Sequence, residues 1–114
     1  MPFIDKIDPA TTLSLTSLIP LDDGQVNSRT LVQRDDMSMT LFSVATDEEI
    51  GGHTAEGDAL VNILSGEAEV TIRKKAHRVP AGQSILIPAG ARHSLYALEG
   101  FQMLLIVVKP QAEN

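Results

Sequence analysis

Two histidines in separate segments are the residues of this chain best placed to do chemistry. His93 follows the segment Gly82–Gly90, in which a short apolar run ends at a Pro-Ala-Gly turn. His53 lies ahead of a second apolar run, Leu60–Leu64, and of the turn Gly66-Glu67. Neutral imidazoles bind transition metals and hydrogen-bond small ligands. Two imidazoles delivered by separate strands could therefore converge on one metal ion or one ligand.

Composition narrows the kinds of site these histidines can belong to. The chain has 114 residues, 43% of them hydrophobic, which suits one folded domain. It has no cysteine, which excludes disulfides, thiol catalysis and Cys-ligated zinc. The formal charge of −6 argues against nucleic-acid and anionic-membrane partners. The N-terminus has no leader pattern and Met103–Val108 is too short to span a bilayer, so we expect a cytoplasmic protein.

Short strands are the elements expected to position the histidines. Apolar runs separated by Gly, Pro and Asp predict seven of them. They are Val26–Gln33, Ser38–Ala45, Leu60–Leu64, Glu67–Arg73, Ser84–Ile87, Ser94–Leu98 and Gln102–Val108. The segment Thr11–Ile19 is compatible with either a strand or a helical turn. Strands of this length and spacing favour a closed barrel or a sandwich.

The spacing that leads to His93 resembles the second motif of the cupins, in particular the small single-domain, RmlC-like cupins. In that motif Gly, Pro, Gly and His stand at the relative positions of Gly82, Pro88, Gly90 and His93, and Ala97 replaces its usual Asn. The resemblance implies an all-β fold, an antiparallel jelly-roll barrel. It divides the chain into an N-terminal arm, residues 1–25, and a cupin barrel, residues 26–114.

The first cupin motif is matched less completely. His53 stands at its first histidine, whereas Ala55 and Ala59 stand where the family has a second histidine and a glutamate. Alanine has no donor atom, so the resemblance implies a damaged site that would hold one divalent metal (iron, manganese, nickel or zinc) weakly. Asp58 is the tentative replacement ligand, because Gly57 marks a turn where strand alternation fails. The alternative is that Asp58 caps this turn through a backbone N–H.

The three candidate ligands also define the alternatives for chemistry. His53, His93 and Asp58 together would resemble the two-histidine, one-carboxylate centre of non-haem iron enzymes. Without a metal, the two rings could hydrogen-bond a small ligand, or they could be hydrogen-bonded fillers of the barrel. His77 follows a basic hairpin, distant from both motifs, and is interpreted as a surface residue.

Three functions remain open at this point. The first is binding of a small organic ligand, sugar-like or carboxylate-like, at the barrel mouth through His53 and His93. The second is a metal-dependent isomerase or oxygenase built on the same pair, and the third is a non-catalytic structural or regulatory cupin. A homodimer is expected from the resemblance, with the segment Thr11–Gln33 adding strands to the partner's sheet and covering an exposed edge.

Overall fold

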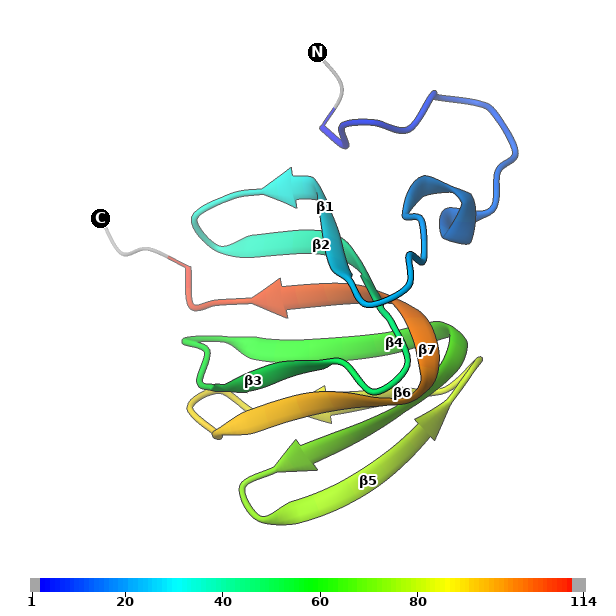
Figure 1. Cartoon of the computed structure of the whole chain (residues 1–114). Helices are drawn as coiled ribbons and strands as arrows, with labels where there is room; N and C mark the ends of the chain where they lie inside the picture. The colour runs from blue at the N-terminus through cyan, green and yellow to red at the C-terminus, as the bar shows by residue number, and fades with distance from the viewer. Residues whose placement is uncertain (1–2, 112–114) are drawn as a thin grey trace.

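Seven antiparallel strands and one short 3-10 helix form along the chain, and the computed structural model describes residues 3–111 (Figure 1). The elements are η1 (Leu15–Leu18), β1 (Val26–Gln33), β2 (Met37–Val44), β3 (Glu49–His53), β4 (Asp58–Ile72), β5 (Lys75–Pro80), β6 (Ser84–Ile87) and β7 (His93–Val108). The strand order is β1-β2-β7-β4-β5, with β3 on β7 and β6 on β4. The predicted all-β antiparallel fold is confirmed. Within residues 3–111 no helix has the length and apolar character needed to cross a membrane.

Two long strands replace four of the predicted short ones. β4 joins Leu60–Leu64 to Glu67–Arg73, and β7 joins Ser94–Leu98 to Gln102–Val108. The pairing of β4 with β7 is irregular around Gly66, whose φ is +75°. A Cβ at Gly66 would overlap the backbone of Gly100 on the neighbouring strand. These glycines therefore let two strands bend together at a close approach, and the breaks predicted there were wrong.

Two strands had no clear pattern in the sequence. β3 pairs only with β7 and β5 pairs only with β4, so each has one free edge. Most of their side chains are exposed or half-buried, which removes the apolar alternation that predicts a strand. The segment Thr11–Ile19, left open between strand and helical turn, contains the 3-10 helix η1.

Aliphatic side chains fill the interior of the barrel. The buried core consists of Val44, Ala59, Val61, Ile63, Ala68, Val70, Val79, Ile87, Ala91, Leu95, Ala97, Phe101 and Met103. Alternate residues of β4 and β7 supply much of it, as expected for strands with one face inside. Phe101 is its one aromatic ring, because the chain has few aromatic residues.

A second, smaller core lies between the N-terminal segment and the outside of the sheet. Ile19, Leu31 and Leu41 are its buried centre, and residues of η1 pack against it. The Gln102 side-chain amide donates hydrogen bonds of 2.8 Å to the carbonyls of Thr16 and Ile19. The described part of the arm therefore folds back on its own barrel, above β1 in Figure 1.

Candidate functional site

The two histidines singled out from the sequence meet at one end of the barrel. His53 is the last residue of β3 and His93 is the first residue of β7, and the two are direct cross-strand partners. Directly opposite residues of an antiparallel pair project from the same face of the sheet. Their ring centroids are 4.5 Å apart, and the rings meet edge to face at 63°. The structure thus brings the two imidazoles into contact.

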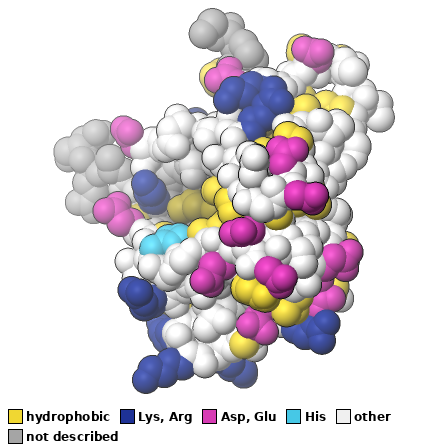
Figure 2. Space-filling model, viewed as in Figure 1, with side chains coloured by type: hydrophobic (Ala, Val, Ile, Leu, Met, Phe, Trp, Pro, Cys, Tyr) yellow, Lys and Arg dark blue, Asp and Glu magenta, His cyan; other side chains and the backbone are white. Residues whose placement is uncertain are grey.

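One ring is inside the barrel and the other is at its rim. His93 is 6% exposed, and it lies between β3 on one side and Ile72 of β4 on the other. His53 is exposed and belongs to an edge strand. In Figure 2 a histidine lies beside a hollow in whose floor apolar side chains are visible. The pair therefore joins the barrel interior to its surface.

Both rings are oriented by the backbone in the same way. The Nδ1 atom of His53 is 2.7 Å from the Gly51 carbonyl oxygen, and the Nδ1 atom of His93 is 3.0 Å from the Ala91 carbonyl oxygen. A carbonyl oxygen only accepts hydrogen bonds, so each Nδ1 carries the proton and donates. In the neutral ring Nε2 is then left with a free lone pair.

The Nε2 atom of His93 is available although its residue is buried. Within residues 3–111 it makes no hydrogen bond, and none of the fully buried side-chain nitrogen or oxygen atoms there lacks a partner. Nε2 of His93 is therefore not fully enclosed by residues 3–111. The site offers two hydrogen-bond acceptors beside an apolar interior, an arrangement that suits a small ligand with hydroxyl groups.

Two loops beside the histidines, β3–β4 and β6–β7, are joined by hydrogen bonds. The Ala89 N–H donates to the Asp58 carboxylate over 2.9 Å, and the Gly90 N–H donates to the Ala55 carbonyl over 2.9 Å. Gly57 is buried, and a Cβ there would overlap the Val108 carbonyl oxygen. The loop between β3 and β4 is thus held from both sides, and the rim is preorganised.

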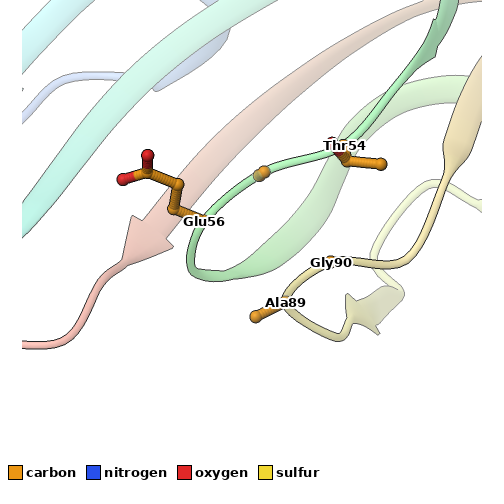
Figure 3. A pocket seen from close by; sticks show the side chains of 5 residues that line it. Thr54, Glu56, Ala89 and Gly90 are labelled. Atoms are coloured by element: carbon orange, nitrogen blue, oxygen red, sulfur yellow. The ribbon is translucent and has the colours of Figure 1, made fainter.

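A shallow hollow of about 680 Å³ lies on these loops (Figure 3). Thr54, Ala55, Glu56, Ala89 and Gly90 line it, and neither histidine does. In Figure 3 the Glu56 carboxylate points away from Ala89 and Gly90. The hollow is open to solvent, whereas the histidine pair has an enclosed side, so the pair is the better candidate site.

The residues present do not fit a metal centre with three protein ligands. The carboxylate of Asp58, the candidate third ligand, instead accepts a hydrogen bond from the Ala89 N–H on the loop between β6 and β7. The alternative left open by the sequence was a cap of the turn at Gly57, which is a different turn. Ala59 lies in the core and has no donor atom. Within residues 3–111 no group of three or more His, Asp or Glu side chains is arranged to hold a metal ion. The set of His53, His93 and Asp58 is not assembled.

His77 lies elsewhere than the sequence placed it. It belongs to strand β5, opposite Val70 of the core, and it is half-buried. Direct opposition to an inward residue puts His77 on the inner face, so its interpretation as a surface residue was incomplete. The alternation of His77 with the buried Val79 is the signal that could have shown this.

Four basic residues lie at the end of the barrel that holds the two histidines. Arg73, Lys74, Lys75 and Arg92 are exposed at this end, and the Arg73 N–H donates to the Arg92 carbonyl over 2.7 Å. The ion pairs among residues 3–111 are Arg34–Asp36 and Arg78–Glu67, so none of these four cations has a carboxylate partner there. Figure 2 shows Lys and Arg side chains gathered near the histidine. Basic side chains without carboxylate partners among residues 3–111 thus lie near the histidines, on the same rim as the carboxylates of Glu56 and Asp58.

Comparisons with known proteins agree with this architecture. The model of the Cupin domain matches residues 40–109. A conserved protein of unknown function from Streptococcus pyogenes is 52% identical, with a TM-score of 0.95 and 98% of each chain covered. A cupin superfamily protein from Desulfitobacterium hafniense is 30% identical, with a TM-score of 0.89 over 94% of this chain and 98% of that one.

A third solved structure is longer than this chain. The chain is 35% identical to a Cupin 2 conserved barrel domain protein from Leptotrichia buccalis, with a TM-score of 0.83 over 85% of this chain and 47% of that one. The comparison with curated proteins gives no significant match. The resemblance first seen in the spacing from Gly82 to His93 is thereby confirmed, and the chain belongs to the cupin family.

Proposed function

We propose that this cupin binds a small organic ligand at the barrel mouth, with the Nε2 atoms of His53 and His93 accepting hydrogen bonds from its hydroxyl groups. The observation that supports this most is the contact between the two rings, 4.5 Å apart, with both Nδ1 atoms committed to backbone carbonyls. Two preoriented acceptors beside an apolar interior match the usual makeup of a small-molecule site.

Two arginines at the mouth favour a ligand that also carries a carboxylate. Arg92 and Arg73 lie at this end of the barrel without carboxylate partners among residues 3–111. Guanidinium groups pair well with carboxylates. A hydroxy acid or sugar acid combines hydroxyl groups, from which the histidines would accept hydrogen bonds, with a carboxylate that the arginines would attract.

A metal-dependent isomerase or oxygenase is less well supported. Such a centre needs a third protein ligand, and Asp58 is engaged with the Ala89 N–H. The ligand-binding proposal requires only donor and acceptor groups that the chain possesses. A structural or regulatory role without a ligand is the outcome that the following experiment would reveal.

The test is an NMR titration of the histidine rings with gluconate and, as its neutral counterpart, glucose. We expect saturable shifts of the His53 and His93 ring signals with gluconate. Loss of one hydrogen bond in His53→Ala should weaken binding about tenfold. His77→Ala is the matched control and should leave the affinity unchanged. An unchanged gluconate affinity in His53→Ala, followed at the His93 ring, or no shift in the wild type with either probe, would contradict the proposal.

We also propose that the chain forms a homodimer through the outer face of its sheet. Leu60 and Leu86 are direct partners on β4 and β6 and are 36% and 53% exposed, and Val108 is 57% exposed on β7. Exposed apolar residues that adjoin one another are typical of an interface. Light scattering should give twice the chain mass, and Leu60→Glu with Leu86→Glu should give one chain mass. A wild-type monomer at high concentration would rule the dimer out.

A further inference from the structure

The pairing of β3 with β7 contains one extra residue just before His53. Ile50 pairs with Leu95, and His53 pairs with His93. From the first pair to the second, β3 advances by three residues (50 to 53) and β7 by two (95 to 93). Gly51 and Gly52 occupy this irregular stretch, which is a β-bulge.

The extra residue decides which way His53 faces. Side chains alternate along a strand, so a regular continuation from Ile50 would put Gly52 on the inner face, opposite His93. His53 would then lie opposite Arg92 and project outward. Because one residue is added, His53 takes the inner position and meets His93. A slip of one residue moves every side chain of a strand to the other face of the sheet. The bulge, with His53 inward, and regular pairing, with His53 outward, are therefore alternatives.

We infer that the Gly51–Gly52 bulge is a positioning element that turns His53 into the barrel mouth. This role is carried by the backbone and is separate from the ring chemistry of either histidine. The bulge also orients the ring that it delivers, because the Gly51 carbonyl accepts the hydrogen bond from Nδ1 of His53 over 2.7 Å. Its importance for binding rests on the proposed function, whereas its effect on the ring pair does not.

Gly52 makes room for the side chain that covers the bulge. A Cβ on Gly52 would lie 3.0 Å from Nη2 of Arg92 and 3.3 Å from its Cζ and Nε atoms. The Arg92 guanidinium thus lies against the Gly52 backbone, in the space a side chain would occupy. A Cβ on Gly51 would have no heavy atom within 4 Å. The two glycines are therefore not equivalent, and Gly52 is the more restricted of the pair.

Few other contacts specify the register of β3 on β7. β3 is an edge strand, and its burial pattern has no fully buried residue. Glycine-rich strands without a strong apolar pattern specify their register weakly. The number of residues between Ile50 and His53 is then the main determinant of the direction in which the imidazole points.

Two deletions test this dependence on residue number. Deleting Gly51 alone leaves one residue between Ile50 and His53, and regular pairing then keeps the imidazole on the inner face. Deleting both glycines places it next to Ile50, on the outer face. We expect the ring-to-ring nuclear Overhauser contact between His53 and His93 to persist in the single deletion and vanish in the double deletion. The opposite result in either folded variant would overturn the inference.

A measurement on the unaltered chain covers the case in which a deletion fails to fold. Cross-strand contacts between backbone protons should join residue 53, and not residue 52, to His93. Contacts from residue 52 instead would overturn the inference without any substitution. The ring contact also separates this inference from the proposed function, because a wild type that shows the contact but no gluconate shift would contradict only the function.

Discussion

The two histidines present the same imidazole in the same tautomer, yet the fold supports them in different ways. His93 is 6% exposed and lies between two strands, at the end of the intact Gly82–His93 segment. His53 is exposed on an edge strand, behind a bulge of two glycines. One half of the candidate site is therefore part of the core, whereas the other half depends on local backbone pairing.

This difference matters for how the site could change. A core position tolerates few changes, since its neighbours are packed on all sides. An edge strand with glycines can adapt its register at little cost in stability. The position of the His53 ring can then change with the register of β3, whereas core packing fixes the position of the His93 ring.

The largest contrast should appear in the core residues beneath the two histidines. Leu95 on β7 is 3% exposed, while its partner Ile50 on β3 is only partly buried. We expect Leu95→Ala to lower the free energy of unfolding by about 2–5 kcal/mol, since it leaves a cavity in the core. Ile50→Ala should lower the free energy of unfolding by clearly less than Leu95→Ala does. Urea unfolding of both variants measures the difference, and equal losses would remove the distinction between the two sides.

The loop after His53 should be the next most sensitive feature. In Gly57→Ala the added Cβ would overlap the Val108 carbonyl, so the backbone must move. We expect a loss of about 1–3 kcal/mol in unfolding free energy, within the usual range for steric conflict in a packed site. Gly51→Ala is the matched control, because its Cβ meets nothing within 4 Å. Thermal unfolding compares the two variants, and an unchanged Tm for Gly57→Ala would contradict the close approach of this loop to the Val108 backbone.

Removing each ring in turn compares the two halves directly. His93→Ala should destabilise the fold by about 1–3 kcal/mol, because it removes buried volume and leaves the Ala91 carbonyl without its hydrogen bond. His53→Ala should change stability by less than about 0.5 kcal/mol, as for most exposed positions. Denaturant unfolding at one pH gives both values. A larger loss of unfolding free energy for His53→Ala than for His93→Ala would show that His53, and not His93, is the more firmly packed histidine.

The smallest effect should appear at high pH, where the anchorage of β3 can be weakened without mutation. Tyr96 of β7 lies opposite Glu49 of β3, and its hydroxyl donates to the Asp47 carboxylate over 2.7 Å. This hydrogen bond, with burial and the charge of Asp47 adding to it, raises the pKa of Tyr96 above 10.0. A raised pKa in the folded state contributes stability below the unfolded value, and this is lost as pH rises through the folded value.

We therefore expect stability to decline slightly above about pH 10. Tyr96→Phe should remove that part of the decline, which thermal unfolding between pH 8 and 11 would measure. Deprotonation also places a charge beside Asp47 and Glu49, so hydrogen exchange should rise in β3 before it rises in β7. Simultaneous loosening of both strands would show that β3 is held as firmly as β7.

Much of the scaffold was predictable because its signals are local. Strands β1 and β6 begin and end where the apolar runs predict, at Val26–Gln33 and Ser84–Ile87. The segment that delivers His93 was recognised from glycine and proline spacing alone. The strands β3 and β5 were missed because Glu49–His53 and Lys75–Pro80 contain no apolar run, whereas β6, which also pairs with a single strand, consists mainly of one. The continuity of β4 and β7 was missed because Gly66 and Gly100 allow a close crossing as well as a turn.

The candidate site was predictable in part. Both histidines follow from the motif. The hydrogen bond from the Ala89 N–H to Asp58 was not foreseen, because it joins two distant loops, whereas the stated alternatives were a metal ligand and a cap of the turn at Gly57. The direction of the His53 side chain was not predictable. It depends on whether Gly51 and Gly52 pair regularly with β7 or form a bulge, and two glycines have no side-chain preference that decides between these registers.

Residue types and spacing determined that this chain consists of short strands and carries two imidazoles at recognisable positions. The resemblance to the cupins, which rests on that spacing, implied the antiparallel barrel and the alanines in place of two further ligands. Those properties are local, since spacing defines turns and side-chain chemistry defines donors. Tertiary structure decided that the rings touch, that neither Nε2 atom is hydrogen-bonded within residues 3–111, and that Asp58 accepts a hydrogen bond from the Ala89 loop. These features arise from pairing between distant segments, and strand register, which no local pattern encodes, sets the direction of every side chain in that pairing.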